Sequence, residues 1–218
     1  MDLLERAVSS DTSIGCDPAV LLAFKSHAAL PVDPSWTESD PLLKAYLLAA
    51  EQQVNWLTGM PYEPDQYTLT FDTFDWKRSK QTGSGWNVRG FPFAEKKIPM
   101  RPVAQSPEPT ISWTANDGTT GTWVAGTDFN IVGVNSITPK LYFPYDFVFP
   151  QTAQVPYPFV LTWSTTGVRG SGYDGVAKIC IFEYAAAYYR KPEMAGQKID
   201  FVSQVFDANL TLLLGSML

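Results

Sequence analysis

The sequence is poor in the residues that most enzyme chemistry requires. It contains one histidine, His27, among 218 residues. Every Ser-His-Asp or Cys-His mechanism would have to use this one side chain, and the paired histidines of an HExxH zinc site are excluded. His27 lies in a predicted helix, and the sequence carries no nucleophile motif. We therefore expect a structural or surface role for His27, and no catalytic residue, cofactor or metal.

Cysteine is equally scarce. Cys16 and Cys180 lie far apart and form no CxxC pair, which excludes a zinc site made of cysteine alone and argues against a disulfide framework. Cys180 falls in an apolar helical pattern and is expected to be a small buried residue. The N-terminus lacks a signal-peptide pattern, and no stretch approaches the roughly 18 apolar residues of a membrane span. We expect folding in a reducing cytoplasm and no membrane partner.

Basic residues are outnumbered by acidic residues. The chain has 16 Lys and Arg against 22 Asp and Glu, with a net charge of -6. Proteins that grip nucleic acid need clustered basic side chains to displace counterions from phosphates, so specific DNA binding is not expected, although DNA can move past such a surface. Hydrophobic residues make up 45% of the chain and aromatic residues 14%. This composition supports a buried core and argues against disorder of the whole chain.

Both ends of the sequence have helical periodicity. Asp17 and Pro18 are typical of a helix N-terminus, and Pro31 limits that first helix. Asp40 and Pro41 predict the start of a second helix. Gly59 is expected to end that helix in a left-handed conformation. A third helix follows Gly175 and stops before Pro192, and a fourth apolar pattern runs from Phe201 to Leu214.

The middle of the sequence has the two-residue period of strands. Tyr67 to Phe71 alternates apolar and polar residues, and Asn116-Asp117-Gly118 separates two short strand patterns as a hairpin turn does. Further predicted strands cover Phe129 to Val134, Lys140 to Phe143, and Phe159 to Thr165. Most of the chain's 17 prolines and 15 glycines fall here, as in a small sandwich or open barrel.

The order of these elements predicts an α+β fold. Helices at the two ends cannot bury their apolar stripes alone, so we expect them to meet in one helical bundle. Residues 1–61 then form the N-terminal helices and 175–218 the C-terminal helices and tail. Residues 62–174 form a large inserted β domain, either a β-sandwich or a barrel-like sheet.

Several motifs with chemical potential are better explained structurally. Gly118 to Thr122 lacks the GK[ST] ending of a phosphate loop and is expected to be a turn. Asp72 and Asp75 could pair as carboxylates, but their position suggests a strand end. Arg169 to Gly172 is expected to be a flexible joint. A platform of aromatic rings that stacks on sugars is the main alternative from another class, and its members would be Trp113, Trp123, Tyr142, Tyr145, Tyr157 and Trp163.

A series of weak motifs, in a fixed order, resembles the head–tail connector (adaptor) family of long-tailed phages and prophages. Leu22 to His27 is similar to that family's "LK-x-HL" helix, although Ala28 replaces a leucine. Asp40 to Glu51 is similar to its second helix, and Trp56 to Gly59 to its "TGR" helix end, where Met60 replaces the basic residue. Ile98 to Val103 resembles the L-P-x-x-P-V element. Later segments continue the order; they are Leu141 to Pro144, Leu161 to Val168, Val176 to Ile179, and Ala186 to Glu193.

The resemblance covers nearly the whole chain and implies a structural virion protein that is not an enzyme. It implies a homo-oligomeric ring, usually a dodecamer, bound beneath the portal protein at the head–tail junction. Such a ring extends the channel for double-stranded DNA and offers its far face to a stopper or tail-completion protein. A different tail-completion protein is a further alternative.

Composition suggests which residues serve as interfaces in such a ring. The apolar C-terminal segment, with Phe206, Leu210, Leu213 and Leu214, is the candidate for contact with the portal or a neighbouring subunit. The stretch rich in proline and aromatic residues, with Tyr145, Phe147, Phe149 and Tyr157, is the candidate for the tail-side partner.

Overall fold

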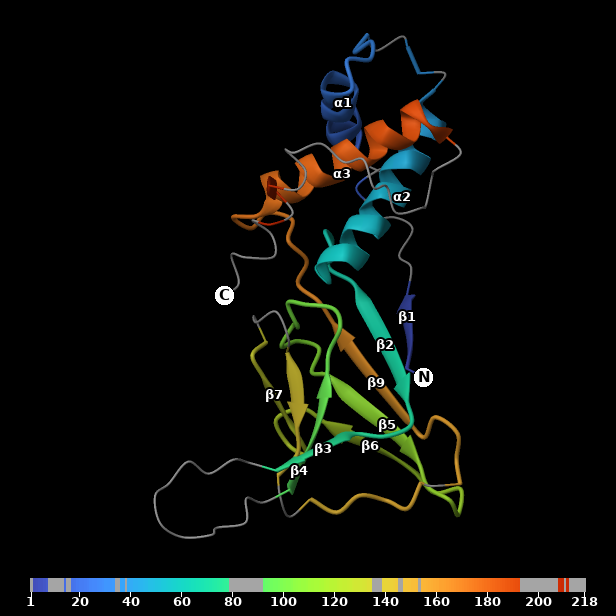
Figure 1. Cartoon of the computed structure of the whole chain (residues 1–218), viewed down its shortest axis with the longest axis vertical. Coiled ribbons are helices and arrows are strands. Elements are labelled where there is room, and N and C mark those ends of the chain that lie inside the picture. The colour runs from blue at the N-terminus through green and yellow to red at the C-terminus, as the bar shows by residue number, and fades with distance from the viewer. Residues whose placement is uncertain are drawn as a thin grey trace. The chain divides into compact units, whose positions relative to one another are not determined.

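The computed structural model describes residues 2–7, 14, 17–33, 36–37, 39–78, 92–134, 139–144, 147–152, 154–192, 208–209 and 211. Within them the chain is α+β, with three α-helices and nine β-strands in two antiparallel sheets (Figure 1). The predicted α+β class is confirmed. The strands described here form two open sheets, so the barrel-like alternative is wrong for this part of the chain.

The chain divides into two compact units. The β unit comprises residues 1–7 and 66–165, and the helical unit comprises residues 8–65 and 166–218. The domain limits predicted after residues 61 and 174 remain predictions. Sequence periodicity did not predict the first strand, β1 (Leu3–Ala7), which pairs with β2 (Gln66–Phe71) and so places the N-terminus in the β unit.

Helices α1 (Pro18–His27) and α2 (Asp40–Thr58) begin and end close to the predicted residues. The side chain of Asp17 caps α1 by accepting a hydrogen bond of 2.9 Å from the amide of Ala19, which satisfies one of the unpaired donors of the first turn. The N-cap of α2 is Ser39 instead of Asp40. Gly59 ends α2 with φ 64°, the left-handed conformation predicted for it.

Helix α3 (Asp174–Arg190) packs on α2, and α1, α2 and α3 contribute to one hydrophobic core. Its largest fully buried side chains are aromatic: Phe24, Tyr62, Tyr184 and Tyr188. Helices from both ends of the sequence therefore bury their apolar stripes together. None of the helices described has the length and apolar character needed to cross a bilayer. Most of the predicted helix from Phe201 to Leu214 lies outside the described residues.

The first sheet of the β unit has the order β1-β2-β9-β5-β6. It contains β5 (Thr110–Thr114), β6 (Thr120–Val124) and β9 (Phe159–Ser164). Figure 1 shows β2, β9 and β5 side by side, as their pairing requires. The predicted hairpin turn joins β5 to β6, and Gly118 has the positive φ, 82°, that the turn needs.

The second sheet has the order β3-β4-β8-β7. Its strands are β3 (Asp75–Arg78), β4 (Pro92–Lys97), β7 (Asn130–Val132) and β8 (Lys140–Tyr142). Side chains from both sheets share one hydrophobic core. In β2 and β9 burial alternates along the strand, so Tyr67 and Trp163 face inward as a register pair with ring centroids 5.7 Å apart.

Candidate functional site

Among the residues described, no group of three or more His, Cys, Asp or Glu side chains is placed to hold a metal ion. His27 ends α1, and its Nε2 lies 3.3 Å from Oε1 of Glu183 on α3. Its ring packs 5.7 Å from the ring of Phe182. This position gives His27 a packing role between two helices.

Asp72, one of the two carboxylates considered above, holds a loop in place. Its Oδ1 accepts a hydrogen bond of 2.7 Å from the amide of Tyr157. Tyr157 has φ 51° and is 45% exposed. A left-handed backbone costs a residue with a Cβ about 1–2 kcal/mol, and the contact with Asp72 offsets part of that cost. Asp75 lies in β3, and its side chain is outside the described part.

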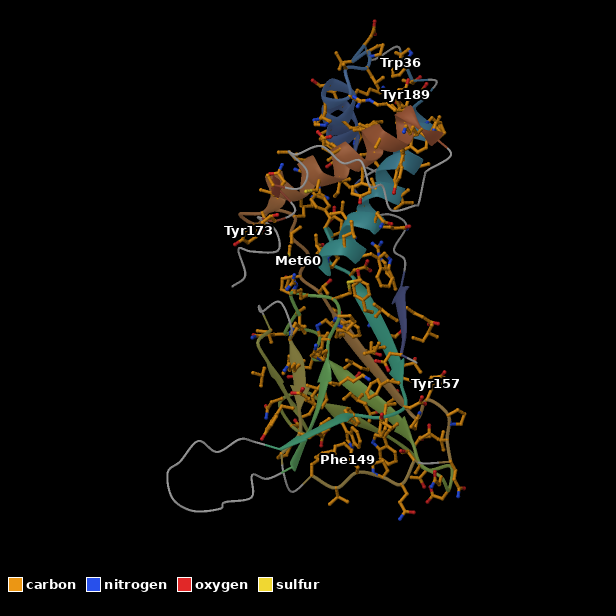
Figure 2. All side chains as sticks on the ribbon, viewed as in Figure 1. Trp36, Met60, Phe149, Tyr157, Tyr173 and Tyr189 are labelled. Atoms are coloured by element: carbon orange, nitrogen blue, oxygen red, sulfur yellow. The ribbon has the colours of Figure 1, made fainter. Side chains whose placement is uncertain are left out.

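Two of the predicted tail-side residues close the aromatic core of the β unit. The rings of Phe147 and Phe149 are half-buried and lie 4.6 Å and 4.9 Å from Phe143. Trp123 contacts both, at 5.0 Å and 5.6 Å. Val148 between them points outward and is 86% exposed. Figure 2 labels Phe149 and Tyr157 on this unit. Tyr145, the remaining predicted residue, lies outside the described part.

The exposed surface of this segment is therefore smaller than the sequence suggests. Val148 and Tyr157 offer apolar area to a partner, while Phe147 and Phe149 stabilise the unit itself. The sequence signal that separates them is the alternation of the three residues Phe147, Val148 and Phe149, which places the first and third on one side of an extended chain. The tail-side role of the segment stays a prediction.

Trp113 in β5 lines two shallow hollows. One, of about 330 Å³, is lined by the β5–β6 turn and by Pro150 and Gln151. The other, of about 440 Å³, is lined by β5, β6 and the segment Tyr157–Pro158–Val160. The Trp113 ring packs against Gly121, where a Cβ would run into it, and lies 5.7 Å from Trp123. The ring is thus partly covered by the protein, and Trp113 is half-buried.

The predicted aromatic platform is not formed as a whole. Trp123 is 8% exposed and Trp163 only 1%, and the indole Nε1 of Trp163 donates to the carbonyl of Met100 at 3.1 Å. Tyr142 and Tyr157 are exposed, but Tyr142 belongs to the second sheet. A flat stacking surface would need adjacent exposed rings on one sheet face. The predicted portal-side residues, Phe206, Leu210, Leu213 and Leu214, all lie outside the described part.

A polar network in the helical unit was not predicted. Arg169 donates to Oε1 of Glu63 at 2.7 Å and to Oδ2 of Asp17 at 2.9 Å. Tyr62 donates to Oδ1 of Asp174 at 2.8 Å, and Lys178 donates to the other oxygen of that carboxylate at 3.0 Å. The partners are up to 152 residues apart in sequence. Apart from Asp174 and Lys178, which are four residues apart on α3, no local pattern could have revealed these pairs.

The network corrects the expectation of a flexible joint at Arg169–Gly172. The backbone amides of Val168 and Arg169 donate to the carbonyl of Tyr62 at 3.0 Å and 2.9 Å. Gly167 has φ 68°, and a Cβ there would lie 2.6–2.8 Å from backbone atoms of residues 62–64. The segments that follow α2 and precede α3 are thus bonded to each other at the start of α3.

Burial governs the ionisation of this network. It raises the pKa of Glu63, although the hydrogen bond and charge of Arg169 oppose that rise. Burial and the hydrogen bond to Asp174 raise the pKa of Tyr62 far above its ordinary value. Burial also acts to raise the pKa of Asp174, but hydrogen bonds from Lys178 and Tyr62 outweigh it and leave that pKa lowered. The network is therefore sensitive to loss of either cation.

No protein-family model matches the sequence, and no curated protein matches it. Two solved structures share the fold. One is titled as the neck of an empty gene transfer agent (GTA) particle computed with C6 symmetry; it has 14% identity and a TM-score of 0.61 over 99% of this chain and 94% of that chain. The other is titled as the virion of a native GTA particle, with 14% identity, a TM-score of 0.62 and the same coverage. At this identity the likeness shows the fold.

Proposed function

We propose that this chain is an adaptor subunit of a head–tail connector: a structural virion protein without enzymatic activity. Copies of it form a ring, a dodecamer, beneath the portal protein of a phage or phage-like particle. The ring extends the DNA channel and docks the stopper or tail-completion protein. In this proposal the three helices belong to one bundle. The β unit is a sandwich inserted into the chain between α2 and α3.

The observation that carries the proposal is the extent of the structural likeness. The similar chains, from the neck and the virion of a GTA particle, align with 99% of this chain, so the likeness takes in both compact units. A shared sandwich alone would say little about function, because sandwiches serve many functions. An α+β chain matched over both units is a narrower likeness, and a dodecameric ring is compatible with the C6 symmetry of that neck.

Charge supports the channel role. The chain has six more acidic than basic side chains, and acidic walls repel phosphate, so that DNA can pass without adhering. This predicts passage of double-stranded DNA without sequence-specific contacts. If substitutions that make the channel lining net positive left DNA ejection unchanged, the charge argument would be wrong.

The proposed contacts of the ring follow the sequence predictions. Phe206, Leu210, Leu213 and Leu214 contact the portal or a neighbouring subunit, and the segment around Tyr145, Phe147, Phe149 and Tyr157 meets the tail-side partner. Truncation after Asp207 should then weaken portal attachment more than it weakens folding, as measured by pull-down and by thermal unfolding. Equal loss of both would contradict the docking role of the C-terminus.

The test of the function is co-expression with the portal protein encoded in the same genome, followed by electron microscopy of the purified complex. A symmetric ring stacked on the portal is the expected result. A chain that stays monomeric, leaves the portal bare and binds glycans on an array would support the carbohydrate-binding alternative. A ring that binds only a tail tube would indicate a different tail-completion protein.

A further inference from the structure

Helices α1 and α2 reverse the usual placement of charged and apolar side chains. Lys25 is 5% exposed and Glu51 is fully buried, whereas Leu22, Leu42 and Trp56 are 51%, 50% and 59% exposed. Charged residues are rarely buried unless they are paired, so a buried charge and an exposed apolar patch are the informative exceptions to normal burial. Both exceptions occur here on the same two helices.

The buried charges have partners inside the helical unit. Nζ of Lys25 lies 2.6 Å from Asp40 and donates to the carbonyl of Trp36 at 2.9 Å. Glu51 accepts from the amide of Ile14 at 3.1 Å. With His27 paired to Glu183, Lys44 is the one remaining acidic, basic or histidine side chain of α1 and α2, and it is exposed.

One stripe along α2 carries no charged side chain over the length of the helix. At 100° per residue, Leu42, Ala45, Ala49 and Trp56 fall on one stripe, and three of these four are exposed while Ala49 is half-buried. Gln52 and Gln53 complete the stripe, and Lys44 lies outside it. We name this stripe the α2 face. It has a large side chain near each end and two alanines between them.

The outward face of α1 has the complementary shape. Its exposed residues are Pro18, Ala19, Leu22, Ala23, Ser26 and His27. At 100° per residue, Ala19, Leu22, Ala23 and Ser26 lie at the centre of this exposed side, and we name these four the α1 face. All but one are small, and small residues let a second helix approach closely. Helix α1 has ten residues and is therefore about 15 Å long, while Leu42 and Trp56 are separated by about 21 Å along α2. An α1 face is therefore short enough to lie between these two side chains, an arrangement in which Leu22 would contact Ala45 and Ala49.

We propose that the α1 face of one copy packs on the α2 face of the next copy in a ring. The proposal rests on the proposed ring function and names its subunit contact. A ring needs two different, complementary faces on each subunit, and one chain supplies both. A second copy also suits a surface that lacks charge, because neither helix loses a hydrated ion when the two meet.

Two engineered cysteines test the contact in the full-length chain on its portal. The double variant Leu22→Cys/Ala49→Cys, in a Cys16→Ser background, is treated with a short bismaleimide after assembly. Head-to-tail packing should give a ladder of covalent oligomers on a denaturing gel, and each single cysteine should give none. Dimers from either single variant would show a self-complementary contact and overturn the proposal.

Two point variants on neighbouring residues of α2 supply a matched control. Ala45→Glu places a carboxylate in the α2 face, where packing would bury it without a partner, and should lower the fraction of chain in rings at least about tenfold. Lys44→Glu changes the net charge by more than Ala45→Glu does, but Lys44 lies outside the α2 face, so rings should persist. Normal rings from Ala45→Glu, with its fold checked by circular dichroism, would overturn the contact.

The outcomes separate this contact from the function on which it depends. Rings on the portal without cross-linking in the double variant would leave the adaptor function standing and remove the α1–α2 contact. No association of the unmodified chain with the portal, in the same microscopy, would remove both.

Discussion

The carboxylate of Glu63 accepts a 2.7 Å hydrogen bond from Arg169, although the two residues lie 106 positions apart. Glu63 is 4% exposed and lies shortly before Gln66, where the second segment of the β unit begins, while Arg169 follows Thr165, where that segment ends. The pair therefore joins the two segments of the helical unit between which the strands are inserted. Its charge balance is the basis of the first prediction.

Arg169→Gln should destabilise the helical unit by about 1–3 kcal/mol, because it leaves a buried carboxylate without its cation. The loss should depend on pH. Burial already raises the pKa of Glu63 above 4.5, and without Arg169 the pKa rises further. The folded state then binds the proton more tightly than the unfolded state, so stability falls as pH rises above 4.5 through the folded pKa.

Urea unfolding of wild type and variant at pH 4 and pH 8 measures this effect. The deficit of Arg169→Gln should be small at pH 4 and larger at pH 8. Adding Glu63→Gln should remove most of the pH dependence, since no carboxylate then remains to titrate. A deficit that is equal at both pH values would mean that Arg169 acts through packing and not through charge.

Gly167→Ala should be far more damaging than Gly170→Ala. Both glycines have positive φ, 68° and 73°, so both variants meet the left-handed cost of about 1 kcal/mol. Only at Gly167 does the added Cβ also run into backbone atoms of residues 62–64. We expect a loss beyond 3 kcal/mol, roughly the sum of that cost and overpacking, in thermal or urea unfolding. Similar losses of stability at the two positions would show that the backbone of residues 62–64 shifts at little cost to accommodate the added Cβ.

Cys180 should resist thiol reagents in the folded protein. It is fully buried in α3, and burial, with a smaller contribution from Glu183, raises its pKa to about 12. The thiolate is the reactive form, so both its scarcity and its inaccessibility slow the reaction. In a Cys16→Ser background, Ellman's reagent should label the chain only after denaturant is added. Rapid labelling under native conditions would mean that α3 opens readily.

Val148 and Phe149 should separate docking from folding at the candidate tail-side segment. Phe149→Ala removes a half-buried ring from the contacts with Phe143 and Trp123 and should cost roughly 2–3 kcal/mol, below the value for a fully buried ring. Val148→Ser alters a side chain that is 86% exposed and should change stability by less than about 0.5 kcal/mol.

Pull-down of the tail-side protein gives the second readout for this pair. If Val148→Ser keeps wild-type stability and loses binding, the segment is a docking surface. Unchanged binding by a folded Val148→Ser variant would contradict the tail-side role proposed for this segment.

Elements with strong local signals could be predicted from the sequence alone. Proline and aspartate at the start of α1, and glycine at the end of α2, act within one helical turn, so their effect depends on few distant residues. The alternation in β2 and β9 and the turn at Asn116–Gly118 are local in the same sense. These signals were sufficient for the α+β class and for most strand positions.

Which of those residues pair and which stay exposed depends on the tertiary structure. Strand β1 has no distinctive periodicity and exists through its pairing with β2. Residue type does not distinguish the buried aromatic residues of the β unit from the exposed ones. Packing buries Trp163 and leaves Tyr157 at the surface. Lys25 and Glu51 are buried because distant partners neutralise or bind them, and Leu22 and Trp56 are exposed on the same helices. Burial is a property of the assembled chain, since the free energy of placing a charge or a ring depends on neighbours that sequence spacing does not specify.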